Sequence, residues 1–150
     1  MSSELLQNSI QSRIDHLKAQ FLAEADWEKR YERLLRLGKS LAPMDSALKT
    51  EQTRVRGCQS QVWMVATEQP KGRLALVADS DAAIVKGLVA VLVQVYNGAT
   101  VEEILQTKPG FLAEMGFDTH LSPSRANGLR SMIALLYTRV FEMSRHSQSQ

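Results

Sequence analysis

Cysteine is scarce in this sequence: Cys58 is the one cysteine among 150 residues. A single cysteine cannot form an intramolecular disulfide, which favours a reducing compartment such as the cytoplasm. A structural zinc site needs about four ligands in close pairs, whereas His16, His120 and His146 are scattered along the chain. An iron–sulfur cluster held in the usual way needs several cysteines. We therefore expect no metal site.

An excess of one charge, long hydrophobic runs and glycine-rich phosphate loops are also missing. The 18 basic and 16 acidic residues leave a net charge of +2, without the basic excess that a nucleic-acid partner would require. The longest apolar run, residues 88–93, falls far short of the roughly 20 residues that span a bilayer. Glu4 stands where a signal or transit peptide would carry basic residues. We expect a cytoplasmic protein that binds neither nucleic acid nor membrane.

What is present is the composition of a globular domain, 44% hydrophobic and 23% charged, in a length that suits one core. We predict a single domain over residues 1–150, with loose tails at about 1–9 and 145–150. Apolar spacings of three and four predict helices over residues 10–25 and 27–37. Asp26 is the expected N-cap of the second helix and Gly38 its expected end.

Further helices follow in the second half of the chain. One runs from Asp79-Ser80-Asp81, where one of the three residues should cap it, to Tyr96, and its apolar residues on nearly every side predict burial. Thr100 with Glu103 forms a capping box for a short helix. Another short helix opens at Pro109, and the last begins at the N-cap Ser122 with Pro123 at its first position.

Alternating and β-branched residues predict three short strands, at 53–56, 61–67 and 73–78, the last two joined by a turn at 69–72. Such a small antiparallel sheet needs a helical layer on one face. The expected class is α+β.

Cys58 is the strongest candidate for a chemically reactive residue. A lone cysteine is most often a small buried hydrophobe, but Cys58 follows Gly57 and precedes polar residues at an expected loop tip. Arg54 and Arg56 are close enough in sequence to favour the thiolate, which is the nucleophilic form. An apolar lining from Val55, Val62 and Trp63 would allow a resting state in which the thiol is tucked inward.

Other candidates are weaker. Arg125 lies in the first turn of a helix, where the dipole disfavours a cation, so it suggests pairing with an anionic group. Helix capping accounts for Asp79 and Asp81 without any function. His120 is the one histidine that suits a Cys-His pair with Cys58, although a surface loop histidine explains it better.

Four blocks carry a resemblance to a known family. They are WEK at 27–29 with Tyr31 and Leu37-Gly38, GCQSQVW at 57–63, DSDAAIVKGL at 79–88, and LSPSR at 121–125 with Gly128-Leu129. In this order and at these spacings they resemble the SufE/CsdE family, the sulfur-acceptor partners of cysteine desulfurases, and QSQ at 59–61 is closer to the SufE branch. The match covers the chain from about Asp26 to the last helix.

The resemblance implies a fold similar to the IscU/NifU-like iron–sulfur scaffold proteins: a small three-stranded sheet packed on helices. It implies that Cys58 accepts sulfur as a persulfide from a pyridoxal-phosphate cysteine desulfurase of the SufS type, stimulates that enzyme, and passes the sulfur to iron–sulfur cluster assembly. Gln59, Ser60 and Gln61 would dock the partner, Asp81 would contact it or hold the loop, and Arg125 would support the thiolate or the loop. No cofactor would belong to this chain, which is then a sulfur carrier rather than a stand-alone enzyme.

Two alternatives remain at this point. A cysteine-nucleophile hydrolase or thiol peroxidase would use Cys58, with His120 as its base. An interaction module would make no use of the thiol.

Overall fold

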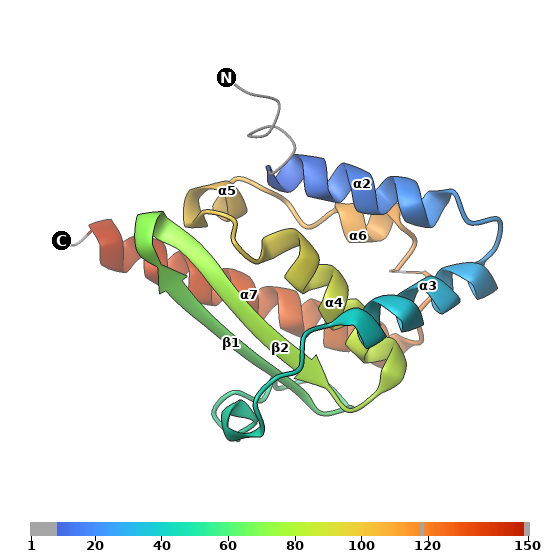
Figure 1. Cartoon of the computed structure of the whole chain (residues 1–150), viewed down its shortest axis with the longest axis horizontal. Coiled ribbons are helices and arrows are strands. Elements are labelled where there is room, and N and C mark those ends of the chain that lie inside the picture. The colour runs from blue at the N-terminus through green and yellow to red at the C-terminus, as the bar shows by residue number, and fades with distance from the viewer. Residues whose placement is uncertain (1–8, 118, 149–150) are drawn as a thin grey trace.

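The computed structural model describes residues 9–117 and 119–148. It is an α+β fold in which one antiparallel hairpin packs against a group of helices (Figure 1). Its longer elements are α2 (Ile10–Leu22), α3 (Trp27–Ser40), β1 (Val62–Gln69), β2 (Arg73–Ser80), α4 (Ala83–Tyr96) and α7 (Pro123–Gln148). The short ones are the 3₁₀ turns η1 (Ser46–Leu48) and η2 (Pro70–Gly72) and the helices α5 (Val101–Leu105) and α6 (Phe111–Glu114).

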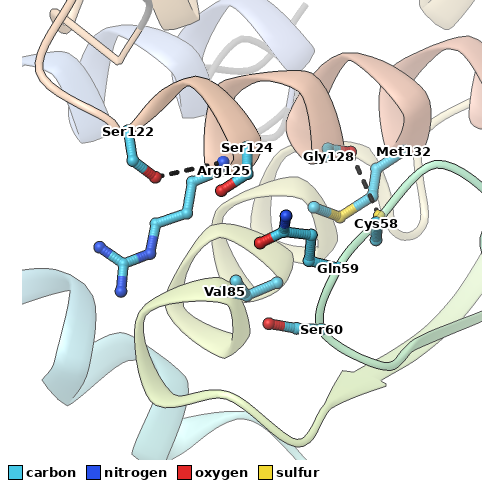
Figure 2. A pocket seen from close by; sticks show the side chains of 9 residues that line it. All are labelled: Cys58, Gln59, Ser60, Val85, Ser122, Ser124, Arg125, Gly128 and Met132. Atoms are coloured by element: carbon cyan, nitrogen blue, oxygen red, sulfur yellow. Dashed lines mark hydrogen bonds between the residues drawn. The ribbon is translucent and has the colours of Figure 1, made fainter.

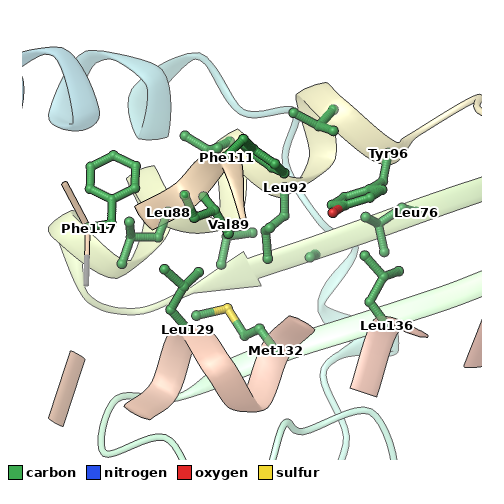
Figure 3. Packing of buried hydrophobic residues seen from close by; sticks show 14 of the residues in the cluster. Leu76, Leu88, Val89, Leu92, Tyr96, Phe111, Phe117, Leu129, Met132 and Leu136 are labelled. Carbon is green, nitrogen blue, oxygen red and sulfur yellow. The ribbon is translucent and has the colours of Figure 1, made fainter. Parts of the chain in front are cut away.

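Helix α4 lies at the centre of the molecule. It contacts β2 and the helices α2 and α3, and its residues are buried around most of its circumference, as its apolar sequence predicts. Figure 3 shows Leu88, Leu92 and Tyr96 of α4 packed in one cluster with residues of β2, α6 and α7. The beginning of α4 and the beginning of α7 thereby become neighbours beside one end of the hairpin (Figure 1).

The hairpin has the predicted turn but lacks the predicted third strand. Val62–Gln69 and Arg73–Ser80 pair in continuous antiparallel register, from Val62 opposite Ser80 to Gln69 opposite Arg73. The sequence at 53–56 forms only an isolated bridge between Arg54 and Trp63. It stays this short because the chain closes a turn from Thr50 to Thr53 and turns away again at Gly57, whose φ is +90°.

Gly38 was the wrong end for the second helix, because α3 continues to Ser40. Gly38 is buried where α3 crosses α4, and a Cβ placed on it would lie 3.0 Å from the backbone nitrogen of Gly87. Its role is therefore close helix packing, which helical φ and ψ permit, and not the left-handed conformation of a helix end.

Capping was predicted correctly at three helices and wrongly at one. Asp26 accepts the Lys29 amide, Thr100 and Glu103 form the capping box, and Ser122 accepts the Arg125 amide at the start of α7. The N-cap of α4, by contrast, is Ala82, with no side-chain hydrogen bond. The Ser80 hydroxyl accepts the amide of Ala82 itself, and the Asp81 carboxylate accepts the Gln61 amide outside the helix.

The described residues at the two chain ends differ from the predicted tails. Ser9 caps α2, and α7 runs on to Gln148, so residues 145–148 are helical. Residues 1–8 and 149–150 lie outside the described residues. Within the described residues, none of the helices combines the length and the apolar character required to cross a bilayer.

Candidate functional site

Cys58 lies on the loop that leads into β1 and faces a cavity of about 310 Å³ (Figure 2). The walls of the cavity come from three segments distant in sequence: the cysteine loop, the first turn of α4 and the first turns of α7. The residues that line it are Cys58, Gln59, Ser60, Val85, Ser122, Ser124, Arg125, Gly128 and Met132. The motif at 57–63 and the motif at 121–129 thus meet at the thiol, and the motif at 79–88 contributes Val85 to the cavity.

The thiol is half-buried and rests against α7. Its S–H group donates a hydrogen bond to the carbonyl oxygen of Gly128, with Sγ and O 3.6 Å apart. On the helix side the contact is an ordinary one, since a Cβ on Gly128 would lie 3.4 Å from Sγ. On the loop side glycine is needed at Gly57, because its φ is +90° and a Cβ would lie 2.5 Å from the Ser131 hydroxyl oxygen. Gly57 therefore allows the loop to lie against the helix.

Burial decides the protonation of the thiol. Burial raises the pKa of Cys58, and although the positive charge of Arg54 lowers it, the net pKa is above its ordinary value. Arg56 forms an exposed ion pair with Glu51 and is not among the causes of the shift. The expectation that the arginines favour the thiolate is therefore confirmed for Arg54 and not for Arg56, but burial outweighs Arg54 and the protonated thiol is favoured in this state.

The apolar side of the cavity differs from the predicted lining. Val55 and Val62 are buried in the core, and Trp63 does not line the cavity. Val85 and Met132 line it in their place, and Figure 2 shows the Met132 thioether next to Cys58. These residues are 27 and 74 positions away in sequence, so only the tertiary fold brings them to the thiol.

Ser80 and Asp81 hold the far end of the cysteine loop. The Asp81 carboxylate accepts the Gln61 amide at 3.0 Å, and the Ser80 hydroxyl donates to the Gln61 carbonyl at 2.8 Å. The Gln61 carbonyl also accepts the Asp81 amide at 3.2 Å. Asp81 thus fixes the loop instead of capping α4. Gln61 is anchored through its backbone while its exposed side chain lies outside the cavity lining, unlike Gln59 and Ser60.

Asp79 and Lys49 were missed as site residues by the sequence reasoning. Asp79 is 5% exposed, and its carboxylate pairs with Lys49 at 2.9 Å and Lys86 at 3.4 Å. Burial alone would raise the pKa of Asp79, but hydrogen bonds from Lys49 and the Ser80 amide and the two lysine charges bring it below its usual value. No sequence pattern pointed to Lys49, which lies in a stretch without periodicity.

Arg125 lines the cavity without reaching the thiol. Its guanidinium extends away from Cys58 in Figure 2, and it forms no ion pair with the residues that the structure describes. It is also not a cause of the Cys58 pKa shift. Arg125 is therefore available at the rim of the cavity for an anionic group.

His120 is not placed to act on Cys58. Its ring stacks on Trp27 with centroids 4.1 Å apart, and no histidine lines the cavity. The Cys-His alternative thus finds no base in this arrangement. Among the described residues, no group of three or more His, Cys, Asp or Glu side chains is arranged to hold a metal ion.

Comparison with known proteins identifies the family of the chain. Residues 15–140 match the family described as SufE, Fe-S metabolism associated domain. The chain belongs to the SufE family. The match contains the Cys58 loop and every residue of the cavity lining, and it associates the chain with iron–sulfur metabolism.

One solved structure is similar in fold to this SufE-family chain. It is the solution structure of a hypothetical protein from Thermus thermophilus, with 23% sequence identity and a TM-score of 0.73. The similarity covers 89% of this chain and 96% of that chain. At this identity the likeness establishes the fold alone.

Proposed function

We propose that the chain is a sulfur-relay protein. It takes persulfide sulfur from a pyridoxal-phosphate cysteine desulfurase onto Cys58, stimulates that enzyme by removing its sulfur, and delivers the sulfur to iron–sulfur cluster assembly. The observation that carries the proposal is the placement of the one cysteine: on a loop anchored at its far end, facing a cavity, in a chain of the SufE family.

The transfer step balances without an outside oxidant or reductant. The Cys58 thiolate attacks the terminal sulfur of the desulfurase persulfide, a new S–S bond forms to Cys58, and the old S–S bond breaks. The desulfurase cysteine leaves as a thiolate and takes up a proton. The terminal sulfur keeps its oxidation level and is now the outer atom of a Cys58 persulfide.

The resting geometry supports a mechanism in which the loop opens before this attack. In the cavity the thiol is half-buried, its pKa is raised, and its proton is engaged with Gly128. When the loop leaves α7 on docking, burial ends, the charge of Arg54 remains, and the thiolate becomes accessible. The closed state in turn protects the thiol from oxidation between encounters.

Docking rests on the surface beside the loop. We propose that Gln59, Ser60 and Gln61 contact a SufS-like desulfurase and that Arg125 offers its free guanidinium to an anionic group there. The chain needs no cofactor of its own for this role, and a scaffold complex receives the sulfur. Structural likeness to scaffold proteins of the IscU/NifU type stays a prediction.

The test is the intact mass of the protein after incubation with a cysteine desulfurase, pyridoxal phosphate and cysteine. We expect wild type to gain one sulfur atom that reductant removes, and Cys58→Ser to gain none. Desulfurase turnover should rise with wild type and not with Cys58→Ser. If wild type gains no sulfur and turnover is unchanged, the relay is wrong, and peroxide and thioester assays test the hydrolase and peroxidase alternatives.

A further inference from the structure

The segment before the cysteine loop is attached to the protein at few points. Residues 45–56, called here the leading segment, are tied together internally: Glu51 pairs with Arg54 at 3.8 Å and with Arg56 at 3.5 Å. The Thr53 hydroxyl donates to the Leu48 carbonyl at 2.6 Å. These links hold residues 48–56 of the leading segment together. The contacts of these residues with the rest of the molecule therefore determine where Gly57 and Cys58 lie.

Two backbone hydrogen bonds attach the leading segment to β1. The Val55 amide donates to Val62, and the Met64 amide donates to Thr53, both at 2.8 Å. This is a short pairing at a sheet edge, and Val55 adds one buried side chain. Such an edge attachment is easily lost unless a further contact supports it.

Lys49 supplies that contact. Its ammonium lies 2.9 Å from the buried Asp79 carboxylate and 5.1 Å from the centre of the Trp63 ring. Trp63 and Asp79 are cross-strand partners in the hairpin, so the Lys49 side chain contacts both strands at the same pair of residues. Within the described part of the chain, the ion pair of Lys49 is the one that links the leading segment to the rest of the protein.

The Asp79-Ser80-Asp81 segment consequently holds both ends of the cysteine loop. Ser80 and Asp81 bind the Gln61 backbone after Cys58, and Asp79 binds Lys49 before it. Arg54, and not Lys49, is the positive charge that acts on the Cys58 thiol. Any influence of Lys49 on Cys58 is therefore exerted through position.

We propose that Lys49 is a positioning residue for Cys58: its pairing with Asp79 and Trp63 keeps the leading segment on the hairpin and so holds the thiol in its cavity until the loop is released. This deepens the sulfur-relay proposal and rests on it for its biological meaning. The positioning role itself can be measured on this protein alone, without a desulfurase.

The chain provides a matched pair of variants. Lys49→Met and Lys86→Met each remove one ammonium from the same Asp79 carboxylate and keep a long apolar stem, but Lys86 lies on α4 and not on the leading segment. The measurement is the rate at which N-ethylmaleimide modifies Cys58, followed by intact mass from pH 6 to 10, with the melting temperature of each variant.

We expect Lys49→Met to react about fivefold faster than wild type, the size of effect that loss of a partly exposed ion pair has on an equilibrium. Its rate profile should shift to lower pH, because the released thiol is no longer buried. Lys86→Met should stay within about twofold of wild type, and Lys49→Arg should restore the slow rate.

Equal rates for Lys49→Met and wild type overturn the proposal, and so do equal increases in Lys49→Met and Lys86→Met, which would show general loosening around Asp79. A slower reaction in Lys49→Met would indicate a direct charge effect and overturns it as well. The desulfurase is absent from this experiment, so failure of sulfur transfer and failure of the positioning role are seen separately.

Discussion

Cys58 is held on α7 by a hydrogen bond to Gly128. The Gly128 carbonyl oxygen accepts the thiol proton, and a Cβ on this residue would lie at ordinary van der Waals distance from Sγ. The anchors at Gln61, by contrast, act on backbone atoms of the loop and not on the thiol. The thiol contact thus uses the helix backbone and does not depend on a missing side chain at Gly128.

Gly128→Ala should leave Cys58 seated and the protein about as stable. Alanine is favoured over glycine inside a helix by about 1 kcal/mol, and a Cβ 3.4 Å from Sγ makes an ordinary van der Waals contact with the thiol. We expect modification by N-ethylmaleimide within about twofold of wild type and a free energy of unfolding within about 1 kcal/mol of wild type. Severalfold faster modification would show that the thiol does not tolerate a side chain at this position.

The raised pKa of Cys58 makes stability depend on alkaline pH. The unfolded chain releases the thiol proton near its ordinary pKa of about 8.5, whereas burial keeps it bound to higher pH in the folded protein. The stabilising contribution is complete below the unfolded pKa and is lost as pH rises toward the folded pKa. In urea titrations from pH 7 to 10, wild type should lose more stability than Cys58→Ser, and parallel curves would refute this.

At the scale of elements, the crossing of α3 and α4 fixes one wall of the site. Gly38 and Gly87 face each other there, and a Cβ on Gly87 would lie 2.4 Å from the Leu34 carbonyl oxygen. Because that atom belongs to the backbone, no side-chain rotation relieves the contact. The crossing holds α4, and α4 in turn presents Val85 to the cavity.

Gly87→Ala should destabilise the protein by about 1–3 kcal/mol, the usual cost of overpacking a well-packed core. Gly110→Ala is the matched control, because its φ is not positive and a Cβ there would have no neighbour within 4 Å. Chemical denaturation measures both. A Gly87→Ala variant as stable as Gly110→Ala would show that the helices separate at little cost.

At the scale of the whole molecule, most of the buried hydrophobic residues form one cluster that joins α2, the hairpin, α4 and α7. Leu17, Leu74, Leu88 and Leu136 are all fully buried in it. No part of this cluster is separated from the rest by an exposed linker within the described residues. The molecule should therefore unfold as one unit.

Unfolding followed by tryptophan fluorescence and by circular dichroism should give coincident urea transitions. The fluorescence reports Trp27 at the start of α3 and Trp63 on β1, two separate parts of the fold, while circular dichroism reports all the helices. Trp27→Phe and Trp63→Phe resolve the two signals. Different midpoints in these variants, beyond their change in overall stability, would indicate two independently folding parts.

The features that the sequence predicted correctly depend on local interactions along the chain. The helices, the hairpin turn at 69–72 and the caps at Asp26, Thr100 and Ser122 depend on residues within four positions of one another. The family motifs are equally local, so the sequence was enough to single out Cys58 and to indicate the family. The sequence by itself thus determined the α+β class, the position of the lone cysteine and the association with iron–sulfur metabolism.

Tertiary contacts decided the rest. Gly38 reads as a helix end until α4 lies against it, and Asp81 reads as a cap until Gln61, 20 residues earlier, presents its amide. The sign of the Cys58 pKa shift depended on burial against α7, which outweighs the nearby Arg54. Packing and desolvation depend on distances between residues remote in sequence, and the pattern of neighbours along the chain contains no record of them.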